Sequence, residues 1–227
     1  MTKFYILLLW LTTPIVLSGQ LQREYRFNTP LHGKVVLRLH LAANDLAAVR
    51  FGDPTWFQHR KGSGTSDENY LLHVRGLFAA SKPRMHPIYH VFDQALPAVP
   101  DRDFDALVVA FVQSIPYGLI PTRLHGENTH GIFPPLILLR EGYGDCDSKS
   151  ILLATLLTQR HPVLYLVGDS HVFIGLPGQP RTGEQYVEVE GQTWLLCETT
   201  DEWPIGRLPD KMVEAIDRGR YQYIILK

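Results

Sequence analysis

The sequence Gly142-Tyr143-Gly144-Asp145-Cys146-Asp147-Ser148-Lys149-Ser150-Ile151-Leu152-Leu153 decides the expected fold, because it joins a glycine turn directly to an apolar helix. Cys146 stands where that helix begins. The N–H groups and macrodipole of a first helical turn favour negative charge, so we expect a lowered pKa for this thiol. Asp145 and Asp147 are expected to cap the helix, although they would raise the pKa of the thiol if their charges faced it. Lys149 is expected to be solvated at the surface, with an offset of that negative charge as the alternative. A cysteine in such a turn is typical of an enzyme nucleophile.

A histidine and a carboxylate follow in the order that thiol-based acyl transfer requires. His171 opens the apolar run 171–176, and Glu198 directly follows the run 194–197. Neighbouring antiparallel strands can bring such ends within hydrogen-bond reach, so we hypothesise that the two side chains meet. Taken alone, each has an ordinary alternative: a histidine at a strand end bonded to a carbonyl, and an acid that caps a turn.

The surrounding pattern predicts an α+β fold. Apolar residues at helical spacing predict a helix from residue 101 to 115, and the run after Cys146 predicts a second, largely buried helix. Leu119–Pro135, rich in glycine and proline, is expected to form an irregular loop. Short apolar runs separated by turn residues then predict an antiparallel sheet, with strands at 163–167, 171–176, 186–189, 193–197 and 221–226.

The chain is expected to have three parts, with boundaries at 1–19, 20–100 and 101–227. Residues 1–19 carry one early lysine and a mostly apolar run, as an export signal does, so we expect an exported, periplasmic or secreted protein. An uncleaved signal anchor is the alternative, and would be its one link to a membrane. Residues 20–100 are predicted to form a small β-rich region, with strands at 34–41 and 69–74, that packs on or restricts access to the rest.

Composition and residue spacing argue against nucleic-acid binding and against a metal site. Lys and Arg total 22 against 23 Asp and Glu, and no basic cluster predicts nucleic-acid binding. Ten histidines raise the question of a metal, but Pro87 between His86 and His90 argues against a shared helical face, and no metal-binding motif is present. We therefore expect no metal and no cofactor. The two cysteines, Cys146 and Cys197, form a disulfide in the simplest interpretation of an exported protein, but Cys197 lies in an apolar strand pattern and is expected to be a buried free thiol.

Three blocks of the sequence together resemble the transglutaminase-like superfamily of papain-fold cysteine enzymes, especially its bacterial members. The blocks are Gly142-Tyr143-Gly144-Asp145-Cys146-Asp147-Ser148-Lys149-Ser150, His171-Val172-Phe173-Ile174-Gly175 and Leu196-Cys197-Glu198-Thr199-Thr200, within a resemblance that covers about residues 101–206. The resemblance implies a central helix that begins at the cysteine, packed on an antiparallel sheet whose neighbouring strands carry the histidine and the carboxylate. It also implies acyl transfer from amides.

By position, the resemblance makes Cys146 the nucleophile, His171 the general base and then acid, and Glu198 the orienting carboxylate. Many members have aspartate where Glu198 stands, and Asp201 is the alternative third residue. Residues 111–117 also resemble the segment that precedes the cysteine block in bacterial members. Gln113 in that segment is a candidate oxyanion donor, with a solvent-facing amide as the alternative.

These features predict an exported cysteine-dependent hydrolase, a peptidase or amidase, that cleaves peptide or isopeptide bonds through a thioester. Its partner is a protein or peptide substrate, with cell-wall peptide among the candidates. Two alternatives stay open: a protein-crosslinking transglutaminase, and a non-catalytic binding module with the same fold. The sequence does not decide the oligomeric state.

Overall fold

The computed structural model describes residues 21–29, 32–47, 49, 51, 66–96, 99–168 and 171–227. The predicted export signal lies outside these residues. No helix in the described ranges combines the length and the apolar character needed to cross a bilayer. The fold is mixed α+β, as expected from the sequence pattern.

The chain begins with a β-hairpin and continues through helices to a five-stranded sheet. The hairpin pairs β1 (Leu21–Thr29) with β2 (Gly33–Leu41), and β3 (Arg123–Leu124) pairs with β4 (Glu127–Asn128). The helices are α1 (Ala43–Ala47), α2 (Ser66–Ala95), α3 (Asp101–Ser114), α4 (Pro135–Glu141), α5 (Cys146–Leu157) and α6 (Asp210–Asp217). The sheet consists of β5 (Val163–Gly168), β6 (Val172–Pro177), β7 (Tyr186–Val189), β8 (Gln192–Cys197) and β9 (Tyr221–Leu226).

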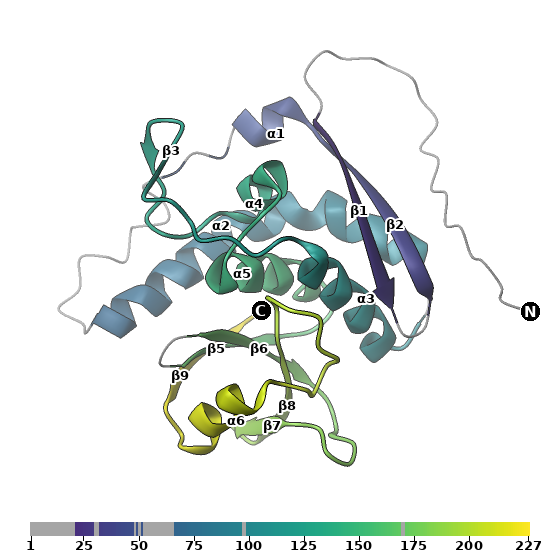
Figure 1. Cartoon of the computed structure of the whole chain (residues 1–227), viewed down its shortest axis with the longest axis vertical. Coiled ribbons are helices and arrows are strands. Elements are labelled where there is room, and N and C mark those ends of the chain that lie inside the picture. The colour runs from purple at the N-terminus through teal and green to yellow at the C-terminus, as the bar shows by residue number, and fades with distance from the viewer. Residues whose placement is uncertain are drawn as a thin grey trace, which may run out of the picture.

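The five strands are antiparallel throughout, in the order β7-β8-β6-β5-β9. Figure 1 shows the curled sheet below the helices α2 to α5, with α6 on the other side. Alternation along β5 explains the two faces: Val163 and Tyr165 belong to the core shared with the helices, whereas Leu164 and Leu166 pack in the cluster that includes α6. The predicted strands and their adjacency around His171 and Glu198 are therefore confirmed.

Helix α5 is buried on nearly all sides, because almost every residue after its first turn is apolar or small. Residues 151 to 157 are buried throughout, and they join the core that also contains the hairpin and α3. This core runs from Tyr25 to Leu226, so the described part of the 20–100 region packs in the same core as the rest of the chain.

The prediction of a β-rich region over residues 20–100 is wrong in its second half. The expected strand at 69–74 belongs to α2, a helix of 30 residues that contains Pro83 and Pro87. Its buried residues, Val74, Leu77, Phe78, Ser81, Met85, Ile88 and Phe92, recur at helical spacing and form a continuous stripe. Both prolines are exposed, so the carbonyls that lose a helical partner can bond to water, and packing of the stripe offsets the cost.

Two smaller expectations also change. Helix α4 begins at Pro135, where the sequence pattern predicted only an irregular loop before the cysteine turn. His86 and His90 do share a face of α2 despite Pro87, with their Nε2 atoms 2.9 Å apart.

Candidate active site

The thiol of Cys146 stands at the first residue of α5, in a turn held from both sides. Asp145 is the N-cap, and its Oδ1 accepts the N–H of Ser148 at 2.9 Å, as predicted. The turn also pairs with the segment after α3, because Gly144 donates to the Pro116 carbonyl and accepts from Gly118, each at 3.1 Å. A Cβ at position 144 would lie 2.6 Å from Leu138 Cδ1, so glycine is required for this close approach.

The pKa of the Cys146 thiol is raised to about 12, contrary to the expectation from its helix position. Burial is the largest cause, the charge of Asp147 the next, and Asp145 adds to both. Backbone N–H groups of Val172 and Asp147 hydrogen-bond to the sulfur and lower the pKa, but only partly. The prediction of a lowered pKa is therefore wrong, and the resting side chain is a neutral thiol.

His171 and Glu198 meet as the strand pattern predicted. His171 Nε2 lies 2.8 Å from Glu198 Oε2, across the ends of the paired strands β6 and β8. The His171 carbonyl accepts the Gly168 N–H at 2.9 Å, and Phe173 packs edge-on against the imidazole with ring centroids 4.8 Å apart. The Val172 N–H that bonds to the Cys146 sulfur belongs to the residue next to His171, so the three predicted residues gather in one place.

The carboxylate of Glu198 is fully engaged. Its Oε1 accepts the N–H groups of Thr199 and Thr200 at 2.9 and 2.7 Å and the Thr200 hydroxyl at 2.5 Å, while Oε2 faces His171. Burial alone would raise its pKa, but the bonds from His171 and Thr200 outweigh this effect, so the pKa of Glu198 is lowered and the group is ionised. Asp201 is exposed and accepts the Glu202 N–H, so Glu198 rather than Asp201 is the partner of His171.

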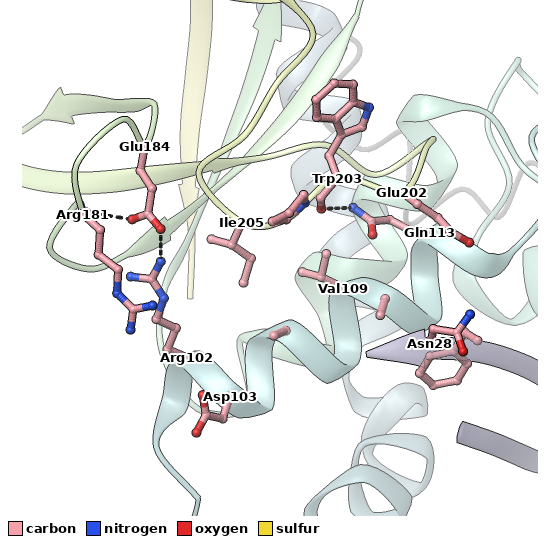
Figure 2. Close-up of a pocket in the computed structure, with 14 residues that line it drawn as sticks. Asn28, Arg102, Asp103, Val109, Gln113, Arg181, Glu184, Glu202, Trp203 and Ile205 are labelled. Atoms are coloured by element: carbon pink, nitrogen blue, oxygen red, sulfur yellow. Dashed lines mark hydrogen bonds and ion pairs between the residues drawn. The ribbon is translucent and has the colours of Figure 1, made fainter. Parts of the chain in front are cut away.

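Gln113 does not have the geometry of an oxyanion donor. Its amide nitrogen donates to the main-chain carbonyls of Glu198 at 2.9 Å and Trp203 at 2.8 Å. An amide NH₂ has two protons, so none is left for a substrate oxygen. Figure 2 shows the side chain reaching from α3 to the Trp203 main chain. The Cys146 backbone N–H, unpaired within its helix, stays the candidate donor.

Lys149 is also not where the sequence pattern predicted. It is completely buried, and its Nζ donates to the carbonyls of Ile115 at 2.7 Å and Gln113 at 3.3 Å. The expectation of a solvated lysine is wrong because the end of α3 covers this face of α5.

The sequence pattern gave no sign of a tyrosine pair beside the thiol. Tyr70 of α2 donates to Asp147 Oδ1 at 2.6 Å, and its oxygen lies 2.9 Å from the hydroxyl of Tyr165 on β5. The Asp147 carboxyl has a raised pKa, mainly from burial, which the Tyr70 bond and the nearby His171 oppose. The sequence pattern predicts a strand over residues 69–74, which include Tyr70. Only a helix over these residues directs the Tyr70 side chain toward the cysteine turn.

The cysteines, the possible metal ligands and the cavity of the described residues complete the surroundings of this site. Cys146 and Cys197 are both free thiols, and Cys197 is completely buried, as predicted. No three His, Cys, Asp or Glu side chains converge as metal ligands within the described part of the chain. A cavity of about 520 Å³ opens beside α3, lined by Gln113, Trp203 and an Arg102–Glu184 ion pair (Figure 2), but neither Cys146 nor His171 lines it.

Comparisons of the chain with known protein families, with curated proteins and with solved structures found no match.

Proposed function

We propose that this chain is a cysteine-dependent hydrolase of peptide or isopeptide bonds, built on a papain-like core of the transglutaminase-like type. One observation carries the proposal. The His171–Glu198 pair, joined at 2.8 Å, stands beside a thiol at a helix N-terminus that accepts the N–H of the adjacent Val172. A nucleophile, a base and a group that orients the base are what acyl transfer requires.

The reaction begins from a neutral thiol, since the pKa of Cys146 is raised to about 12. Nε2 of His171 is engaged by Glu198, so Nδ1 is the nitrogen that accepts the thiol proton as sulfur attacks the substrate carbonyl. The resulting oxyanion accepts a hydrogen bond from the backbone N–H of Cys146 at the helix start. Collapse breaks the C–N bond, and the imidazolium returns its proton to the leaving amine. Water then attacks the thioester, with His171 again as base, which releases the acid and restores the thiol.

Glu198 stabilises the imidazolium that forms in each half of this cycle. Its lowered pKa keeps it ionised at neutral pH, and its fixed bonds to Thr199 and Thr200 hold it in one orientation. Preorganisation of this kind lowers the barrier because no dipole has to reorient during the reaction. The export signal, and a peptide substrate outside the cytoplasm, belong to this proposal as sequence-based predictions.

The test is acyl-enzyme formation. Wild type, Cys146→Ala, His171→Ala and Glu198→Gln are incubated with a panel of peptidyl amides, quenched in acid and measured by intact mass. We expect an acyl adduct on wild type that is absent in Cys146→Ala. A fluorescent primary amine added to the same reaction separates hydrolysis from crosslinking, since a transglutaminase incorporates the amine. A protein without an adduct, whose Cys146 is alkylated by iodoacetamide no faster than in His171→Ala, is a binding module.

A further inference from the structure

Lys149 is a buried cation without a buried anion in contact. Its side chain is completely buried, and no carboxylate among the described residues lies within salt-bridge distance of its Nζ. Burial is the main reason that its pKa is lowered, to about 8. An ammonium in such a place is costly, and a buried charge is often replaced by an apolar side chain without loss of stability. The contacts of its Nζ therefore need an explanation other than stability.

The groups that receive the ammonium are carbonyls at the end of α3. Lys149 donates to the carbonyls of Ile115, the C-cap residue of that helix, and of Gln113, two residues before it. The last carbonyls of a helix lack partners within the helix and carry the negative end of its macrodipole. Lys149 thus joins the start of α5, three residues after Cys146, to the C-terminal end of α3.

Gln113 connects the end of α3 to the loop that follows β8. Its carbonyl accepts from Lys149, while its side-chain amide donates to the carbonyls of Glu198 and Trp203, at the start and in the middle of the segment 198–209 that follows β8. Figure 2 shows this amide between α3 and the Trp203 segment. A second bond links α5 to the same loop, because Ser150 Oγ and Thr199 Oγ1 lie 3.2 Å apart.

We propose that Lys149 and Gln113 are positioning residues that hold the Glu198 loop in register with the cysteine helix and so align His171 with the thiol. The inference deepens the proposed function and rests on it. The chain of contacts is continuous: Cys146 begins α5, Lys149 fixes the end of α3 to it, Gln113 fixes the loop main chain to α3, and Glu198 holds the imidazole. Reacting groups must be held to within a fraction of an ångström, and a displacement of about 1 Å costs about 100-fold in rate.

The ammonium also acts on the loop through its charge. The carboxylates of Glu198 and Asp201 both raise the pKa of Lys149 against the effect of burial. The interaction is mutual, so the cation favours the ionised form of Glu198. Methionine at position 149 keeps the length and apolar stem of lysine but removes both effects.

The test compares Lys149→Met and Gln113→Met with wild type, with Lys211→Met as the matched control at an exposed position of α6. The second-order rate of iodoacetamide labelling at Cys146 is measured at pH 7.5 by peptide mass, beside the melting temperature. A second readout is the ¹H–¹⁵N signal of the His171 Nε2 proton bonded to Glu198. We expect both site variants to label about tenfold more slowly and to lose or shift this signal, whereas Lys211→Met matches wild type.

A purely structural role predicts a different pattern: a lowered melting temperature, with unchanged labelling and an unchanged His171 signal in the folded fraction. That pattern overturns the inference, as does failure of both variants to fold. Failure of the proposed function is distinguishable, because wild type would then label no faster than His171→Ala. In that case the Nε2 signal still decides whether Lys149 and Gln113 align the imidazole.

Discussion

Asp147 sets the reactivity of the neighbouring thiol, and its charge can be removed with little change of shape. Its charge is the second cause, after burial, of the raised pKa of Cys146. Asparagine keeps an oxygen to accept the Tyr70 hydroxyl, which lies 2.6 Å from Asp147 Oδ1. The Asp147→Asn substitution therefore removes a charge and keeps a hydrogen bond.

The size of the effect follows from Coulomb's law. Two like charges about 6 Å apart interact by about 3 kcal/mol at an effective dielectric constant of about 20, which is about two pKa units. The pKa of Cys146 should then fall from about 12 towards about 10. The thiolate fraction at pH 7.5 rises about 100-fold, but each thiolate is about tenfold less nucleophilic, so the labelling rate should rise about tenfold.

The assay is iodoacetamide labelling of Cys146 between pH 6 and pH 9, with peptide mass as the readout. His171→Ala serves as the background, because labelling there reports the thiolate alone. The pKa of Asp147 is raised, mainly by burial, so the series is extended below pH 6 until this carboxyl is neutralised in the parent, where the ratio of variant to parent should fall towards one. The exposed Asp45→Asn on α1 is the control. Equal rates for Asp147→Asn and its parent over the whole range would refute the electrostatic account.

Three further predictions concern stability. The lowered pKa of Glu198 contributes stability that is present above its unfolded pKa and lost as pH falls through the folded value; melting temperatures of Glu198→Gln from pH 7 to pH 3 should therefore fall less steeply than those of wild type. Gly144→Ala places a Cβ 2.6 Å from Leu138 Cδ1 and should cost about 1–3 kcal/mol in urea unfolding; the double variant with the buried Leu138→Ala should lose less stability than the sum of the two single variants, and additive losses would show that the turn moves away from Leu138. Tyr70→Phe leaves the Asp147 carboxylate without its hydroxyl donor, at a cost of about 1–3 kcal/mol; a double-mutant cycle with Asp147→Ala, which removes the acceptor, should give a coupling energy, and additive effects would contradict the contact.

The elements that carry the site were predictable because their signals are local. The helix from residue 101, the helix that begins at Cys146 and the five strands each repeat apolar residues at one clear period. In these elements the residues that decide the structure lie within about ten positions of one another. The pairing of His171 with Glu198, 27 positions apart, was a hypothesis that local periodicity does not decide, because it depends on β6 lying beside β8.

Helix α2 was mispredicted because two local signals conflict with its packing. Residues 69–74 form a short apolar run that suits a strand as well as a helix, and Pro83 and Pro87 normally end a helix. The stripe from Val74 to Phe92 packs in the main core, and this tertiary gain outweighs the local preference. The error also hid Tyr70, whose approach to Asp147 depends on the helix.

The predicted environments of Lys149 and Gln113 are wrong for a different reason. Both stand at polar positions in helical patterns, where a solvated surface is the ordinary outcome. Their burial depends on where the end of α3 meets α5 and the loop after β8, which are contacts between residues 34 to 90 positions apart. No local period encodes such contacts. The predicted pKa of the Cys146 thiol is wrong for a similar reason. The start of the helix favours the thiolate, but burial and the charge of Asp147 outweigh this effect, and both depend on the assembled site.

The arrangement around Cys146 keeps the thiol protonated until a base acts on it. Burial and two acidic neighbours oppose a resting thiolate, and the ionised Glu198 lies against the imidazole of His171. The thiolate and the imidazolium that the attack requires are therefore formed only during the reaction, when Glu198 stabilises the imidazolium. Such a thiol resists oxidation and chance alkylation, since both need the thiolate. If the predicted export and the proposed function hold, this protection preserves the nucleophile in an oxidising compartment until substrate binds.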